Sequence, residues 1–192
     1  MDRLKKIAKN LDSKDDLSEF REKFILPEDK IYLDGNSLGV LAKDTIDDIN
    51  HTIKEEWGNN LISSWNKSWI KLPRMVSQKL ASIIKSGGDE VYVGSSTSIN
   101  LFKLIKSILQ SNKNIKNITT DNLNFPSDKY ICELVAKDFK INFNFLEYGS
   151  DLIADIEKLK EFIIKKRGII VLSHVAYKSS YRYPIKEISE FC

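Results

Sequence analysis

The stretch Glu90-Val91-Tyr92-Val93-Gly94-Ser95-Ser96-Thr97-Ser98-Ile99-Asn100-Leu101 decides how the fold is interpreted. Three β-favouring residues end at Gly94, hydroxyl side chains follow, and apolar residues then recur at helical spacing as Leu101, Leu104, Ile105, Ile108 and Leu109. This pattern predicts a strand at 91–93, a tight turn and an amphipathic helix. Because a helix begins with free N–H groups and the positive end of its dipole, a phosphate would fit there. The simpler alternative is that Ser96, Thr97 or Ser98 only caps the helix.

The chain beyond this stretch alternates between helical and strand patterns. Strands are predicted at 115–120, 141–146 and 168–173, with amphipathic helices between them and after Pro184. Strands that alternate with helices favour an α/β fold whose parallel sheet is covered by helices. Because the strand at 168–173 is apolar on both faces, we expect a neighbour on each side of it. We therefore interpret 73–192 as an incomplete domain; the alternative is that 184–192 is an ordinary terminal helix.

Residues 1–72 have a different character. Leu4, Ile7 and Leu11 indicate a first helix, and Ser13 begins a second that carries Leu17, Phe20 and Phe24. A short strand at 31–33 leads into a glycine-flanked turn at 34–39, and a longer helix with an apolar stripe follows from residue 44. We predict an N-terminal helical arm over 1–72 and an α/β domain over 73–192.

Composition and charge exclude several classes of protein. The 192 residues are 42% hydrophobic and 30% charged with a formal net charge of +3, which is typical of a globular protein without a nucleic-acid face. No apolar run approaches the length of a membrane span, so no membrane partner is expected. Cys132 and Cys192 form neither a disulfide framework nor a metal-ligand pattern. We expect a cytoplasmic protein with reduced thiols and no metal.

Two further loops follow predicted strands and carry side chains suited to binding. The first is Asn124-Phe125-Pro126-Ser127-Asp128, and the second is Ser173-His174-Val175-Ala176-Tyr177-Lys178-Ser179-Ser180. Loops at the carboxyl ends of parallel strands gather at one edge of the sheet, where ligands bind. The alternatives are that Pro126 only begins a helix and that His174 and Lys178 are ordinary loop residues.

Five stretches together resemble kynureninases, in the order and near the spacing of that family. They are Tyr32–Gly39, Glu55–Asn66, Thr97–Lys103, Asn124–Asp128 and Ser173–Lys178. The resemblance runs from about residue 13 to Cys192. It implies a pyridoxal 5'-phosphate enzyme of the aspartate-aminotransferase fold type (fold type I), acting as a homodimer when full length. Such enzymes hydrolyse kynurenine or 3-hydroxykynurenine to anthranilate or 3-hydroxyanthranilate and alanine, in tryptophan catabolism and NAD biosynthesis.

The resemblance also implies roles for individual residues. Thr97 and Ser98 would hold the cofactor phosphate, and Phe125 would stack on the pyridine ring. The other cofactor-binding residues would be Ser127, Asp128 and Ser173, with Ser173 near the phenolic oxygen of the ring or its neighbours. Asn36 and Ser37 would line the substrate side. The resemblance assigns no catalytic residue within the chain.

Two departures from the family pattern affect what we expect. Ser180 occupies a position that is usually glycine, and a serine is strained where φ is positive. The Asp-x-x-His and Tyr-Lys motifs, which bind the pyridinium nitrogen and form the Schiff base, come later in the family than the matched stretch. We therefore expect the chain alone to be inactive. The alternative is a non-catalytic α/β module that binds anions or another protein.

Overall fold

The computed structural model describes residues 2–192 and divides into two compact units, Met1–Val93 and Gly94–Cys192. Each unit is described by itself. No helix within residues 2–192 is long and apolar enough to cross a membrane.

The first unit begins with the predicted N-terminal helix, α1 (Asp2–Asp12). The second predicted helix is only a 3-10 turn, η1 (Ser18–Lys23), and it leads into a strand, β1 (Phe24–Ile25). This strand pairs antiparallel with β2 (Leu41–Ala42). The strand predicted at 31–33 is wrong, because these residues precede the turn at 34–38 without joining a sheet. The β1–β2 pair instead brings together the two ends of the segment 26–40.

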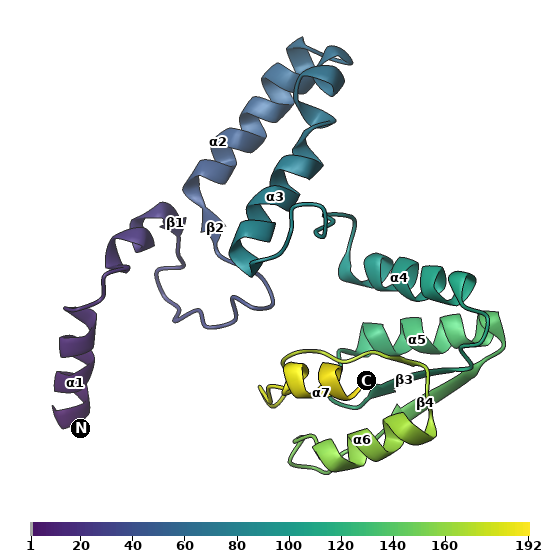
Figure 1. The fold of residues 1–192 in the computed structure, drawn as a ribbon. Coiled ribbons are helices and arrows are strands. Elements are labelled where there is room, and N and C mark those ends of the chain that lie inside the picture. The colour runs from purple at the N-terminus through teal and green to yellow at the C-terminus, as the bar shows by residue number, and fades with distance from the viewer. Residues whose placement is uncertain (1) are drawn as a thin grey trace. The chain divides into compact units, whose positions relative to one another are not determined.

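Helices make up most of the first unit from residue 43 to residue 84 (Figure 1). In chain order they are α2 (Lys43–His51), the π-helical η2 (Thr52–Asn59) and η3 (Trp65–Trp69), and α3 (Leu72–Ile84). Within residues 2–93 only Ser64, Ser77 and Ala81 are buried. The predicted apolar stripe on α2 and η2 exists but stays accessible, since Ile49 is 53% exposed and Trp57 is 64% exposed.

Hydrogen bonds to one glutamate connect η2 to η3. The carboxylate of Glu56 accepts from the indole Nε1 of Trp69 at 2.7 Å and from the hydroxyl of Ser68 at 2.9 Å. The Trp69 bond is the main reason that the pKa of Glu56 lies below its usual range. The Ser64 hydroxyl adds a bond to the carbonyl oxygen of Glu56 at 2.7 Å.

The second unit is an α/β structure, as the sequence predicts. Its parallel sheet has the order β4 (Asn142–Leu146), β3 (Asn117–Asp121), β5 (Ile169–Ile170). Its helices are α4 (Thr97–Ser111), α5 (Pro126–Phe139), α6 (Ile156–Lys165) and α7 (Ile185–Phe191). A parallel sheet buries both faces, and here helices cover each of them.

Each face of the sheet carries its own apolar core. The core beneath α4 and α5 consists of Ile105, Leu109, Ile118, Cys132, Val135 and Ala136. The core beneath α6 and α7 includes Leu146, Leu159, Ile163, Tyr183 and Ile188. Figure 1 shows α4 and α5 together on one side of β3 and β4, and α6 on the other side. Burial raises the pKa of the Cys132 thiol to about 12, so this cysteine stays protonated.

Two predictions about strands need correction. No strand forms at 91–93, so α4 is preceded by irregular chain rather than by a paired strand. The strand predicted at 168–173 is paired only at Ile169–Ile170, and it lies at the edge of the sheet. Because one side of β5 has no neighbouring strand within residues 2–192, its apolar side chains are half-buried rather than buried.

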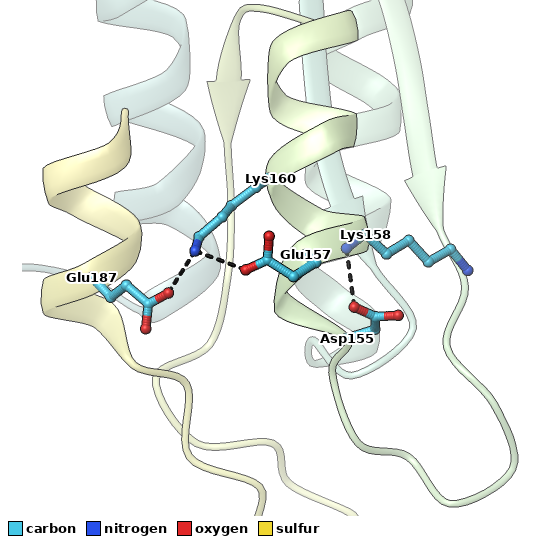
Figure 2. A network of polar contacts seen from close by, with 5 residues as sticks. All are labelled: Asp155, Glu157, Lys158, Lys160 and Glu187. Atoms are coloured by element: carbon cyan, nitrogen blue, oxygen red, sulfur yellow. Dashed lines mark hydrogen bonds and ion pairs between the residues drawn. The ribbon is translucent and has the colours of Figure 1, made fainter.

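An ion-pair network fastens α7 to α6 (Figure 2). The ammonium of Lys160 lies 2.7 Å from a carboxylate oxygen of Glu187 and 2.9 Å from one of Glu157. These two contacts, with Glu187 first, raise the pKa of Lys160. In the same view Asp155 caps α6 by accepting from the backbone N–H of Lys158 at 3.0 Å.

The domain boundary near residue 72 stays a prediction. Contacts within the chain divide it between Val93 and Gly94, which places α3 with the first unit. The two units are defined by contacts within these 192 residues, so they do not test the predicted domain boundary.

Candidate functional site

The connections after β3 and β5 turn to opposite faces of the sheet, which makes this a candidate ligand-binding position. The chain leaves β3 towards α5, on one face of the sheet, and leaves β5 towards α7, which packs on the opposite face. In open α/β sheets, ligands bind where the loops after adjacent strands turn to opposite faces. The two loops that the sequence singled out follow these two strands.

A cavity of about 430 Å³ lies at this position. Its lining residues are Ser96, Thr97, Ser98, Phe125, Ser127, Asp128 and Ser173. All six residues expected to contact a cofactor therefore face one cavity, although they come from three separate stretches of sequence. Its volume is in the range of small-molecule sites, roughly 300–1,000 Å³.

The start of α4 supplies the hydroxyl-rich wall of the cavity. Ser96 is the cap of the helix, and its hydroxyl accepts from the backbone N–H of Ile99 at 3.3 Å. Thr97 and Ser98 are the first two residues of the helix. Ser96 therefore caps the helix, and Thr97 and Ser98 line the cavity together with it. The two interpretations of this stretch are compatible.

The loop between β3 and α5 is held by a buried carboxylate and a buried amide. Asp121, 2% exposed, accepts from the backbone N–H groups of Leu123 and Asn124, both at 3.0 Å. Burial raises the pKa of Asp121, and its hydrogen bonds from Tyr183 and these two amides oppose that shift. The side chain of Asn124, 5% exposed, in turn contacts both Phe125 and Ser173. The loop therefore has a defined conformation.

The aromatic and acidic residues of the cavity stand at the start of α5. Phe125 is 51% exposed, so much of its ring is accessible to a ligand. The ring of Tyr177 meets it edge-on, with centroids 5.1 Å apart and an interplanar angle of 68°. Burial raises the pKa of Asp128, and the Ser127 hydroxyl, 3.4 Å from its carboxylate, opposes that shift.

The loop after β5 folds back on itself. The N–H of Ala176 donates to the carbonyl of Tyr181 at 2.8 Å, and the N–H of Tyr183 donates to that of His174 at 2.9 Å. Ser180 has a φ of 58°, the left-handed conformation that a glycine would adopt without strain. This fixed loop places Ser173 at the cavity.

Asn36 and Ser37 lie in the first unit, in an exposed turn. The hydroxyl of Ser37 donates to the Asp34 carboxylate at 2.8 Å, and its N–H donates to the Asp34 carbonyl at 3.1 Å. Tyr32 closes the turn through a bond from its hydroxyl to the Leu38 carbonyl at 2.6 Å. The role of Asn36 and Ser37 towards substrate stays a prediction.

Two residues of the site were not assigned a binding or positioning role from the sequence. Ser96 lines the cavity as well as capping α4, and Asn124 connects two of the lining residues from beneath. Asn124 could have been noticed in the sequence because it lies between the end of a strand and a Phe-Pro dipeptide. At such a position an asparagine side chain can hydrogen-bond to backbone groups of the turn.

The residues of the cavity suit a phosphorylated aromatic ring. Hydroxyls and free N–H groups at the start of α4 suit an anion, and the accessible ring of Phe125 suits stacking. In the part of the chain that the structure describes, no group of three His, Cys, Asp or Glu side chains is placed to hold a metal ion.

Comparison with known proteins identifies relatives along nearly the whole chain. A kynureninase of Pseudomonas fluorescens is 36% identical over 184 residues, which is 93% of this chain and 43% of that protein. A kynureninase of Burkholderia mallei (strain SAVP1) is 34% identical over 186 residues, and one of Deinococcus radiodurans is 33% identical over 193 residues. No family model matches the chain.

The chain spans 43% of the length of these curated relatives. Its similarity to them covers both the helical arm and the α/β unit, and it is consistent with the N-terminal portion of such proteins.

Proposed function

We propose that this chain, which is similar to kynureninases over 93% of its length, forms the N-terminal part of a pyridoxal-phosphate-dependent hydrolase. The whole protein would cleave the carbon–carbon bond of L-kynurenine or 3-hydroxykynurenine, releasing anthranilate or 3-hydroxyanthranilate and L-alanine. It would act as a cytoplasmic homodimer in tryptophan catabolism. The observation that carries the proposal is that six residues expected from the resemblance line one cavity at the carboxyl edge of the sheet.

In this proposal the start of α4 binds the cofactor phosphate. The hydroxyls of Thr97 and Ser98 and the free N–H groups of the first helical turn would donate to phosphate oxygens. The positive end of the helix dipole adds to this attraction. Ser96 keeps the helix start in place by capping it.

The remaining lining residues would hold the pyridine ring. Phe125 offers an accessible aromatic face, and an offset-stacked ring pair contributes about 0.5–1.5 kcal/mol beyond area burial. Ser127, Asp128 and Ser173 line the same cavity and would contact the polar edge of the ring. Asn36 and Ser37 would contact the substrate.

When bound, pyridoxal phosphate supplies an electron sink for carbanion chemistry. The residues of this chain would bind and orient the cofactor, and we assign none of them as a catalytic residue. For this reason we expect the 192 residues, assayed by themselves, to form no anthranilate from kynurenine.

The second candidate is a non-catalytic α/β module that binds an anion at the same helix start. The observation that favours it is that the cavity combines hydroxyls and a helix N-terminus without a residue that we assign to catalysis. Such a module would bind inorganic phosphate and a phosphorylated pyridine with equal affinity.

The test compares ligands by calorimetric titration of the purified chain. Pyridoxine 5'-phosphate is the probe, because it has no aldehyde to react with surface lysines. We expect it to bind more tightly than pyridoxine or inorganic phosphate, and to be weakened by the Thr97→Val, Ser98→Ala double substitution. Ser111→Ala, at the opposite end of the same helix, is the matched control.

The titration separates the two candidates, and an assay for anthranilate tests the expected inactivity of the chain. No binding of pyridoxine 5'-phosphate, or binding that does not require its phosphate, would contradict the proposed cofactor site. Equal affinity for inorganic phosphate would favour the anion-binding module. Anthranilate formed by the chain alone would contradict the expectation that it is inactive.

A further inference from the structure

The side chain of Asn124 uses its full hydrogen-bonding capacity beneath the cavity. Its Oδ1 accepts from the backbone N–H of Phe125 at 2.9 Å and from the hydroxyl of Ser173 at 2.5 Å. Its Nδ2 donates to the hydroxyl of Thr120 at 3.0 Å and to the carbonyl of Val171 at 3.2 Å. An amide has two acceptor positions and two donor hydrogens, so all four are occupied.

Two backbone groups fix which end of this amide is oxygen. The N–H of Phe125 can only donate, so the side-chain atom that it meets must be Oδ1. The carbonyl of Val171 can only accept, so the atom facing it must be Nδ2. The usual ambiguity between the two orientations of an asparagine side chain is therefore removed.

This assignment determines the direction of the Ser173 hydroxyl. Because Oδ1 carries no hydrogen, Ser173 must be the donor in its contact with Asn124. A serine hydroxyl has one hydrogen and two lone pairs, and here the hydrogen points at the amide. Only the lone pairs of Ser173 remain for a ligand in the cavity that this residue lines.

We propose that Asn124 is the positioning residue of this site, and that it makes Ser173 an obligatory hydrogen-bond acceptor towards the bound ligand. The ligand must then present a donor at this position. On a phosphorylated pyridine ring the donor is the phenolic hydroxyl or a protonated ring nitrogen. The ligand assignment rests on the proposed function, whereas the direction of the hydroxyl does not.

The first experiment needs no ligand. In the ¹⁵N-labelled chain, the side-chain NH₂ of Asn124 should give two resolved NMR signals with slow hydrogen exchange, because both hydrogens are bonded and the group is 5% exposed. The signals are assigned by their loss in Asn124→Asp. Ser173→Ala should shift them together with the N–H of Phe125. Fast exchange, or signals indifferent to Ser173→Ala, would overturn the proposal.

The second experiment measures ligand discrimination by calorimetry. The parent ligand is 4-deoxypyridoxine 5'-phosphate, which has no 4-hydroxymethyl donor. It is compared with its 3-deoxy analogue, which lacks the phenolic hydroxyl, and its 1-deaza analogue, which lacks the ring nitrogen. The analogue that lacks the recognised donor should bind about fivefold more weakly, as expected for one hydrogen bond. Ser173→Ala should abolish this ratio, and Asn124→Leu should reduce it by freeing the hydroxyl to rotate.

A ratio of affinities separates positioning from a general loss of structure. A variant that only loosens the loop weakens all three ligands alike and leaves the ratio unchanged. Asn122→Leu is the matched control, because this neighbouring amide bonds to the backbone of Tyr148 at 3.0 and 3.1 Å and not to the cavity wall. Ser173→Thr keeps the hydroxyl and should keep the ratio.

The outcomes distinguish this proposal from the function on which its ligand rests. If both analogues bind the chain as tightly as the parent ligand, Ser173 does not require a donor and the proposal is wrong. If none of the three ligands binds, the proposed function fails and the ligand assigned to Ser173 fails with it. In that case the NMR result still decides the direction of the hydroxyl.

Discussion

The hydroxyl of Tyr183 donates to the carboxylate of Asp121 at 2.6 Å, and the two residues are 1% and 2% exposed. This bond joins the carboxyl end of β3 to the chain that enters α7, 62 residues later. The other carboxylate oxygen of Asp121 accepts from the backbone of the loop that carries Asn124. Burying a carboxylate is costly unless its oxygens are hydrogen-bonded. Asp121 therefore connects the chain that enters α7 to the loop that carries Asn124 and Phe125.

Removing the donor from this pair should destabilise the second unit. Tyr183→Phe leaves the Asp121 carboxylate without a bond to one oxygen, which costs about 1–3 kcal/mol of unfolding free energy. Urea unfolding followed by circular dichroism is the suitable measurement, since all three tryptophans lie in the first unit. Tyr181→Phe is the control, because Tyr181 packs its ring against Tyr183 and is only partly buried. Equal effects of the two substitutions would contradict the role of the bond.

The raised pKa of Asp121 predicts a defined pH dependence of stability. Because burial raises this pKa in the folded chain, the folded state holds more protons than the unfolded state between the ordinary and the raised pKa. The stabilising contribution is therefore fully present below the ordinary pKa and is lost as pH rises through the raised one. Asp121→Asn removes this titration.

The measurement for Asp121→Asn is the free energy of unfolding in urea at several pH values from 4 to 7. Relative to the parent chain, the variant should become more stable as pH rises, because only the parent buries a charge at high pH. Asp128, whose pKa is also raised by burial, remains in both proteins and cancels in the difference. A difference that does not change with pH would show that Asp121 does not titrate in this range.

Ser180 offers a site for stabilisation. Its φ of 58° costs a residue with a Cβ roughly 1–2 kcal/mol, and glycine adopts this conformation without that cost. Glycine also has greater freedom in the unfolded chain, so we expect Ser180→Gly to raise the unfolding free energy by only about 0.5–1 kcal/mol. Ser180→Ala keeps the strain and serves as the control. A loss of stability in the glycine variant would indicate that the serine side chain has a compensating contact.

Gly168, just before β5, should not tolerate a side chain. A Cβ there would lie 2.2 Å from the carbonyl oxygen of Asn117, in the backbone of the neighbouring strand. Gly168→Ala must therefore push β5 away from β3, with an expected cost of about 1–3 kcal/mol of unfolding free energy. At Gly149, the first atom that a Cβ would meet is a carboxylate oxygen of Asp151 at 3.4 Å, so Gly149→Ala is the control. Hydrogen exchange of the β3 and β5 amides would locate the effect.

The sequence predicted the second unit well because local and long-range preferences agree there. The apolar periodicity of α4 and the alternation in β4 are the patterns that the packed sheet requires, and both elements form as expected. The cavity could be anticipated for the same reason, since parallel strands bring their following loops to one edge.

The failures fall where a strand lacks a neighbour. Residues 91–93 have strong β propensity, yet no strand forms there, because β propensity chiefly reflects packing against neighbouring strands. Ile169 and Ile170 pair with β3 on one side only, which shortens the predicted strand. In the first unit, η1 and β1 replace one predicted helix, since Phe24 pairs with Ala42 at long range. Sequence periodicity does not report such partners.

Phe125 provides a separate test of the aromatic wall of the cavity. Phe125→Leu keeps an apolar side chain but removes the flat ring, which is 51% exposed. If a pyridine ring stacks there, pyridoxine 5'-phosphate should bind about two- to tenfold more weakly, as expected from aromatic pairing energies of about 0.5–1.5 kcal/mol. The affinity for inorganic phosphate should be unchanged, because the start of α4 is not altered.

Tyr130→Leu is the matched control, as Tyr130 is a 65% exposed aromatic residue on the same helix, α5, and does not line the cavity. Equal weakening of both ligands by Phe125→Leu would mean that the substitution disturbs the loop and not a stacking contact, whereas unchanged binding of both would remove Phe125 from the site.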